Sequence, residues 1–233
     1  MRTLVDALID ALRLLRDMDP ALRETVGLTL QVTGGALLIA LVIGIPAGAA
    51  IGLSPRVRGA GLLIPLIYTG MGLPPVAVGL FVYLLLSNQG PMGGLDWLFT
   101  ATGMVMAQTI IAFPLVVGLT MAAVRGVDPQ LPVQLRALGA TRRQTALTTL
   151  VEARLGVTAA VVAAFGSIIS EVGAVMLVGG NIEGQTRVLT TAIVLETRKG
   201  NFALALALGM ILLSLAFVAN FAFYRLQVRR GNR

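Results

Sequence analysis

Long apolar runs without a charged residue dominate this sequence and limit what the chain can fold into. Hydrophobic residues make up 56 % of the 233 residues, and they gather in long uncharged runs rather than alternating with polar ones. Inside a bilayer every backbone N–H and C=O needs a partner within the protein, so only helices and closed barrels can cross it. Barrel strands alternate with a period of two, and these runs do not. We therefore predict an all-α, polytopic membrane protein, a single domain over residues 1–233, with about five spans at 25–53, 60–87, 102–124, 157–178 and 202–224.

Features within and before these runs refine the prediction. Gly44, Gly48 and Gly52 share one helix stripe, which allows another helix to approach closely. The Pro74-Pro75 pair is expected to bend or break the second span. Residues 1–24 alternate leucines with acids at helical spacing, which predicts an amphipathic segment lying on the membrane and not a signal peptide.

The residue types that are missing exclude several functions. The chain has no cysteine and no histidine, so thiol catalysis, disulfides, histidine metal sites and imidazole acid–base chemistry are all ruled out. We predict no catalytic residue, no metal site and no cofactor in this chain. The net charge of +7 lies in short loops between apolar runs, which indicates membrane topology rather than nucleic-acid binding.

The distribution of basic residues predicts the orientation. Loops 54–59, 125–156 and 225–233 together hold eleven basic and two acidic residues, whereas the remaining loops hold seven basic and eight acidic ones. Basic loops stay on the cytoplasmic side. We expect an inner (plasma) membrane protein whose N-terminus lies outside and whose C-terminus lies in the cytoplasm.

The largest predicted cytoplasmic segment, 125–156, has the signals of a helix, a sharp turn and a second helix. Asp128 and the proline after it suit a helix start, and Gly139 suits a left-handed C-terminal position. Thr141 and Gln144 have the spacing of a capping box. An apolar stripe runs along the first helix, and it could rest on the bilayer or fit a partner's groove; it consists of Leu131, Leu135 and Leu138.

Two stretches resemble a known family. Arg136–Leu150, with Leu-Gly-Ala at its turn, resembles the coupling motif of importer permeases of the ATP-binding-cassette (ABC) class, although Val133-Gln134-Leu135 and Glu152 depart from the family's usual Glu-Ala-Ala and Pro. Ser170–Ile193, with Val-Gly-Gly-Asn-Ile at its centre, is similar to the oxyanion branch of that class and most of all to tungstate permeases.

The resemblance implies a type I ABC importer permease that moves tungstate, with molybdate as the second candidate. It implies a homodimer, two copies of a cytoplasmic ABC ATPase that bind ATP and Mg²⁺, and an external oxyanion-binding protein that delivers the anion. The expected ATPase-coupling residues are Leu131, Leu135, Arg136, Leu138, Gly139, Ala140 and Thr141.

The chain has no phosphate-binding loop of its own. Its one lysine, Lys199, lies outside any G-x-x-x-x-G-K-[ST] sequence, so ATP hydrolysis by that mechanism needs a separate subunit. The alternative, a secondary transporter or channel for a small anion, is disfavoured because no internal repeat is detectable and charges within the spans are scarce.

Glu171 is the ionisable residue inside a predicted span, and such residues mark function by default. A carboxylate repels an oxyanion, so we expect a structural or gating hydrogen bond, for example to Ser167 or Ser170, rather than substrate contact. Neutral donors further along the chain suit an anion. The predicted translocation path or gate consists of Ser170, Glu171, Gly173, Asn181 and Thr186.

Overall fold

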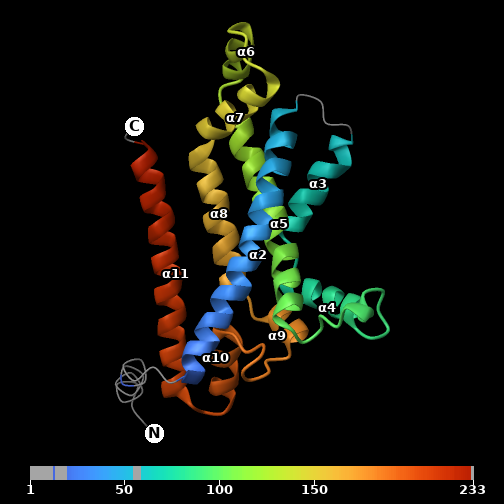
Figure 1. The fold of residues 1–233 in the computed structure, drawn as a ribbon, viewed down its shortest axis with the longest axis vertical. Helices are drawn as coiled ribbons and strands as arrows, with labels where there is room; N and C mark the ends of the chain where they lie inside the picture. Colours follow the sequence, from blue (N-terminus) through green and yellow to red (C-terminus); the bar gives the residue numbers. More distant parts are fainter. Residues whose placement is uncertain (1–12, 14–19, 55–58, 232–233) are drawn as a thin grey trace. The chain divides into compact units, whose positions relative to one another are not determined.

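The protein is described here by a computed structural model, which covers residue 13, residues 20–54 and residues 59–231 (Figure 1). Helices are the only regular elements in these residues, as the apolar runs predict. Most of the predicted amphipathic segment 1–24 lies outside the described residues. The same is true of Arg56 and Arg58 in the first basic loop.

Within the described part of the chain, three helices are long and apolar enough to cross a membrane by themselves. They are α2 (Pro20–Leu53), α5 (Ala101–Arg125) and α11 (Phe202–Gly231). Two bent helix pairs raise the number of candidate spans to five if each pair counts as one. The spans predicted at 25–53, 102–124 and 202–224 therefore correspond to single helices, each longer than expected.

The second predicted span is broken, as the proline pair indicates. Helix α3 (Ala60–Met71) ends before α4 (Pro75–Leu86), and Pro74 with an extended backbone precedes the first turn of α4. Proline is favoured at the start of a helix because its missing N–H would have no partner there. A short 3₁₀ turn, η1 (Gly93–Leu95), follows α4.

The prediction of one helix over 157–178 is wrong. Helix α8 (Arg154–Ile169) ends there, and a separate short helix, α9 (Gly173–Gly179), begins after a break of three residues. Glu171 therefore lies between two helices and not within one. Helix α7 (Arg142–Glu152) precedes α8, and the two helices form a bent pair with an angle of 67° between them.

The chain divides into two compact units, described separately here. The first contains residues 1–36, 74–108 and 168–221. One of its apolar clusters joins α2 to α10 (Leu189–Arg198) and α11 through Leu22, Leu189 and Leu208. A second cluster joins α2, α5 and α9 through Val32, Met104 and Val175.

The second unit contains residues 37–73, 109–167 and 222–233. The glycine stripe on α2 packs here as predicted: a Cβ on Gly48 would lie 2.5 Å from the Val117 carbonyl oxygen of α5. Ala49, Val124 and Ala153 form the centre of an apolar cluster. From this cluster α6 (Gln130–Ala137) and α7 follow the end of α5 (Figure 1).

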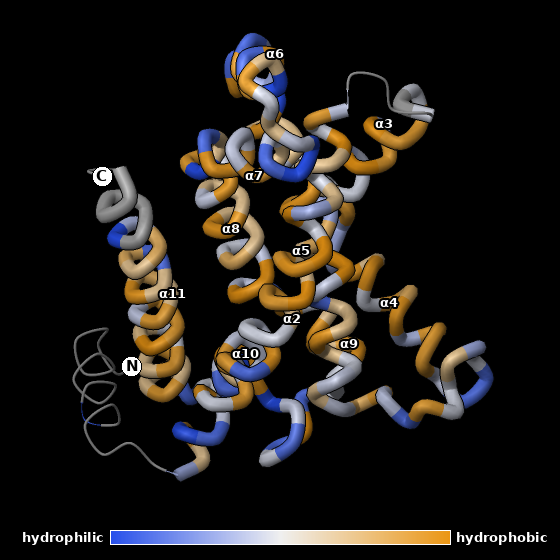
Figure 2. Tube along the Cα trace, turned by 45° about the horizontal axis from the view of Figure 1, so that its top comes forward, coloured by the Kyte–Doolittle hydropathy of each residue, from blue (hydrophilic) through white to orange (hydrophobic). Residues whose placement is uncertain are grey.

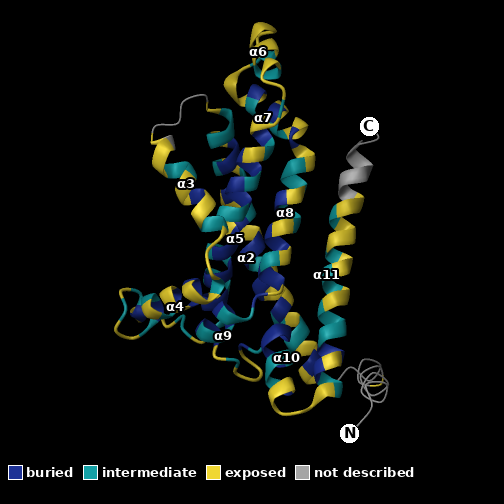
Figure 3. Cartoon of the chain, turned by 180° about the vertical axis from the view of Figure 1, so that it is seen from behind, coloured by how far each residue is buried: buried dark blue, intermediate teal, exposed yellow. Residues whose placement is uncertain are grey.

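Apolar side chains on the long helices are widely exposed, as expected for surfaces in contact with lipid. On α11, Leu213 is 71 % exposed and Phe217 is 69 % exposed. Figure 2 shows α2, α5, α8 and α11 as mainly hydrophobic and the α6–α7 region as much more polar. Figure 3 shows many exposed residues on the middle part of α11. Single exposed leucines are ordinary in soluble proteins, but continuous apolar exposure along a long helix is not.

Candidate functional site

Helix α6, the first helix of the predicted coupling segment, is held at both ends by local hydrogen bonds. The Asp128 carboxylate accepts a 2.8 Å bond from the Gln130 N–H, and its carbonyl accepts one of 3.0 Å from the Leu131 N–H. The Asp128 carboxylate therefore caps the first turn as predicted, although the eight-residue helix begins at Gln130 and Pro129 precedes it. A carboxylate in this position satisfies an N–H that has no partner within the helix.

Gly139 ends α6 in the left-handed conformation predicted for it. Its φ is +87°, which a residue with a Cβ rarely adopts. The Gly139 N–H donates to the Arg136 carbonyl, and the Ala140 N–H donates to the Leu135 carbonyl at 2.9 Å. These two bonds make a Schellman motif, which satisfies the last carbonyls of the helix and reverses the chain.

Helix α7 then begins with the predicted capping box. The Gln144 N–H donates to Thr141 Oγ1, and the Thr141 N–H donates to Gln144 Oε1 at 2.8 Å. Both ends of the turn are thus fixed by residues within the segment. The local sequence therefore specifies the conformation of this turn.

The apolar stripe on α6 is only partly exposed. Leu131 and Leu135 are half-buried, whereas Leu138, at the turn, is 85 % exposed. The exposed apolar surface continues onto the faces of α6 and α7 that Val133, Leu147 and Val151 occupy. A capped helix pair with an apolar tip can enter a groove on a partner.

The predicted path residues Ser170, Glu171 and Gly173 gather at the break between α8 and α9. Glu171 is 8 % exposed, and its Oε1 accepts a 2.8 Å bond from the Ala174 N–H in the first turn of α9. This is the structural hydrogen bond expected of Glu171, but its partner is a backbone amide. Gly173 packs against Val76 of α4, and Ser170 is exposed.

Two side chains distant in sequence satisfy the carbonyls that the break leaves free. Gln108 on α5 donates from Nε2 to the Ile168 carbonyl at 2.9 Å, and Thr190 on α10 donates from Oγ1 to the Glu171 carbonyl at 2.8 Å. Both donors are at most 5 % exposed. Sequence reasoning missed them, because a search for charged residues within apolar runs passes over amides and hydroxyls.

The other two predicted path residues lie beyond the far end of α9, in the loop 180–188. Thr186 is fully buried; its Oγ1 donates to the Gly179 carbonyl and accepts from the Ile182 N–H. Asn181 has a φ of 53°, and its buried Oδ1 has no hydrogen-bond partner among the described residues. Thr186 therefore closes the loop. The length of α9, about 10 Å at 1.5 Å per residue, separates this loop from the break at Glu171.

A second polar cluster stabilises the corner between α10 and α11. The Glu196 carboxylate accepts 2.8 Å and 2.7 Å bonds from Lys199 Nζ and Asn201 Nδ2. The hydrogen bond from Lys199, followed by that from Asn201, lowers the pKa of Glu196 below its usual value of 4.5. Gly200, with a φ of +77°, makes the turn between them.

The described residues combine candidate membrane-spanning helices with a helix pair that is capped from within, which defines the class as a polytopic helical membrane protein. Comparison with known proteins identifies the kind. Residues 40–231 match the family described as "Binding-protein-dependent transport system inner membrane component". The chain belongs to this family of ABC permeases, and it is the membrane-spanning subunit of such a system.

Curated relatives agree over nearly the whole chain. The chain is 41 % identical over 210 residues to a probable anion ABC transporter permease protein of Haloferax volcanii, covering 88 % of this chain and 90 % of the relative. It is 38 % identical over 217 residues to the tungstate uptake system permease protein TupB of Peptoclostridium acidaminophilum, covering 93 % and 95 %. Identity to the molybdenum transport system permease protein ModB of Escherichia coli K12 is 32 % over 209 residues, covering 84 % and 89 %.

Membership of the family identifies the partners in general terms. A binding-protein-dependent system of the ABC class works with an ATPase and with a substrate-binding protein. The alternative of a secondary transporter or channel is not favoured, since the match includes both stretches that carry the resemblance.

Proposed function

We propose that this chain forms the translocation path of an oxyanion importer, with tungstate as the first candidate substrate and molybdate as the second. The names of the relatives in Peptoclostridium acidaminophilum and Escherichia coli K12 support this choice of substrate. In the loop 180–188, the side-chain amides of Asn181 and Gln185 are uncharged donors that suit an oxyanion, whereas the Thr186 hydroxyl is already used to close the loop.

Two copies of the chain would frame the path, with the N-terminus outside and the C-terminus in the cytoplasm. A single chain offers at most five spans among its described residues, and two-fold symmetry is the commonest way to build a larger assembly. The basic loops favour this orientation. ATP and Mg²⁺ would bind to the two ATPase copies, and the chain itself is expected to carry no catalytic residue.

The observation that carries the proposal is the self-capped segment from Asp128 to Glu152, which presents an exposed Leu138 at its turn. We infer that this turn docks into the ATPase. Leu131, Leu135 and Arg136 would support it from α6, and Gly139, Ala140 and Thr141 would fix its shape.

The test uses the permease, its ATPase and its binding protein together in proteoliposomes. We expect tungstate-loaded binding protein to stimulate ATP hydrolysis. Gly139→Val should abolish the stimulation, because valine is strongly disfavoured at a φ of +87°. Gly139→Asn is the matched control, since asparagine tolerates the left-handed region, and it should retain most of the stimulation.

Other outcomes separate the parts of the proposal. Stimulation by molybdate-loaded but not tungstate-loaded binding protein would change the substrate and leave the docking intact. Equal stimulation of Gly139→Val and Gly139→Asn would contradict docking through this turn. Anion transport without any ATPase would contradict the whole proposal.

A further inference from the structure

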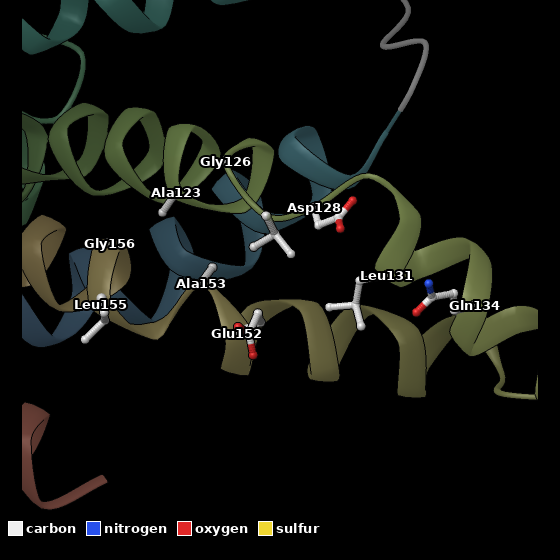
Figure 4. Close-up of a pocket in the computed structure, with 10 residues that line it drawn as sticks. Ala123, Gly126, Asp128, Leu131, Gln134, Glu152, Ala153, Leu155 and Gly156 are labelled. Carbon is white, nitrogen blue, oxygen red and sulfur yellow. The ribbon is translucent and has the colours of Figure 1, made fainter. Parts of the chain in front are cut away.

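A cavity lies beside the proposed docking segment, within the second unit (Figure 4). Its volume is about 560 Å³, and it is bounded by the end of α5, by α6 and by the corner between α7 and α8. Val127, Leu131 and Leu155 contribute apolar walls. Asp128, Gln134 and Glu152 contribute the polar groups.

Charge is segregated around this cavity. Residues 125–156 contain five arginines and only two acids, Asp128 and Glu152. Both acids line the cavity, and none of the five arginines does. Among the described residues neither carboxylate forms an ion pair, although arginines are abundant in the same segment. The cavity is therefore a negative site within a positive surface.

Such a cavity selects a particular kind of occupant. An oxyanion is repelled by the two carboxylates. The described residues hold no group of three or more acids, histidines or cysteines that would bind a metal ion. A lysine or arginine side chain fits both features, because its methylene stem can lie on the apolar walls while its charged end reaches the carboxylates.

We propose that this cavity receives a basic side chain of the ATPase subunit, held between Asp128 and Glu152. The proposal rests on the proposed docking of the segment Asp128–Glu152 to the ATPase, and it adds the chemistry of the contact. The exposed apolar turn at Leu138 would provide most of the contact area, and the two carboxylates would fix the alignment of the ATPase on the segment. Charged pairs at an interface contribute to specificity and to the rate of association, and close pairs also contribute to affinity.

The variants that test this are Asp128→Asn and Glu152→Gln in the full-length permease, reconstituted in nanodiscs. Asparagine is as good a helix cap as aspartate, so Asp128→Asn should keep α6 folded. Glutamine has nearly the shape and the helix propensity of glutamate. Both changes remove one negative charge from the cavity and little else.

The measurement is the dissociation constant of the cognate ATPase at low and at high ionic strength. We expect each variant to bind about tenfold more weakly at low salt, and the double variant to lose most of the salt dependence, because the charge attraction is gone. Glu183→Gln is the control: Glu183 is 74 % exposed, lies in the other unit, and should leave binding unchanged.

A second experiment identifies the basic residue. Glu152→Lys should bind poorly, and reversal of one basic residue on the contact face of the ATPase to glutamate should restore binding in a double-mutant cycle. Failure of every such reversal to restore binding would overturn the proposal.

The outcomes distinguish this inference from the proposed function. If the wild-type permease binds the ATPase and both neutral variants bind equally well at every salt concentration, the docking stands and the cavity contact is wrong. If the wild type does not bind its ATPase at all, the proposed function fails first.

Discussion

At the residue scale, Gly79 is a position in the first unit that leaves no room for a side chain. A Cβ at this position of α4 would lie 2.5 Å from the Ala174 Cα on α9. The clash is with backbone, which cannot rotate away. We expect Gly79→Ala to destabilise the protein by about 1–3 kcal/mol. The measurement is the shift of the thermal unfolding midpoint in detergent.

Gly34 on α2 provides the matched control, because a Cβ there meets nothing within 4 Å. Gly34→Ala should leave the midpoint unchanged or raise it slightly, since alanine favours a helix by about 1 kcal/mol over glycine. Equal destabilisation by both substitutions would show that the contact between Gly79 and Ala174 is not the cause.

Two substitutions test the role of Glu171: one keeps and the other removes the side-chain oxygen that accepts a hydrogen bond from the Ala174 N–H. Glu171→Gln keeps an oxygen that can accept from the Ala174 N–H, whereas Glu171→Ala removes it. We expect Glu171→Ala to lower the free energy of unfolding by about 0.5–2 kcal/mol, as for other helix caps, and Glu171→Gln to lower it by less. Thermal unfolding, together with tungstate-stimulated ATP hydrolysis, measures both. If Glu171→Gln lost the stimulation of ATP hydrolysis while its stability was unchanged, the negative charge itself would be needed for transport.

The sequence singled out Glu171 correctly for a hydrogen bond but could not predict its partner. An ionisable side chain within an apolar run is costly to bury, so its presence there indicates a specific role. The partner is an N–H that is free only because the helix breaks at residues 170–172. Thr186 was predicted for the path, and in the structure its hydroxyl bonds two backbone groups and closes its own loop. The sequence could not indicate this role, because a hydroxyl with two backbone partners looks the same in sequence as a free one.

At the scale of elements, the local shape of the segment from Asp128 to Glu152 was predictable and the break between α8 and α9 was not. Capping boxes, Schellman glycines and N-caps are read from neighbouring residues, so Asp128, Gly139 and Thr141 all met expectation. The break depends on bonds from Gln108 and Thr190, which are 60 and 19 residues distant from their acceptors in sequence. No local signal encodes such contacts.

The corner between α10 and α11 should weaken in acid. The Glu196 pKa is lowered in the folded protein, so its ionised form stabilises the fold. This contribution is complete above the usual pKa of 4.5 and is lost as the pH falls through the lowered value. We expect Glu196→Gln to show a smaller decrease in unfolding temperature below pH 4.5 than the wild type. Parallel curves for the two proteins would contradict the role of the bonds from Lys199 and Asn201.

At the scale of the whole molecule, the absence of cysteine makes the orientation directly testable. Single cysteines at Leu138 and Glu183, both exposed, should be labelled by an impermeant maleimide from opposite sides of the membrane. We expect the Leu138→Cys variant to react only in inside-out vesicles and the Glu183→Cys variant only in right-side-out ones. The reverse pattern would invert the predicted topology.

The class of the molecule and its function came from different parts of the sequence. Apolar runs are sufficient for a helical membrane protein, because the bilayer allows few other folds. They say nothing about transport. The function came from about forty residues in two motifs, while the division into two units follows from packing between helices far apart in sequence.

The self-contained caps of the segment from Asp128 to Glu152 also have a consequence for how such subunits diversify. Because Asp128, Gly139 and the pair Thr141–Gln144 fix its shape from within, the remaining surface positions are free to vary without unfolding it. Under the proposed docking, substitutions on the exposed surface alone are then sufficient to change which ATPase the segment recognises. The membrane-spanning helices need not change when the ATPase does.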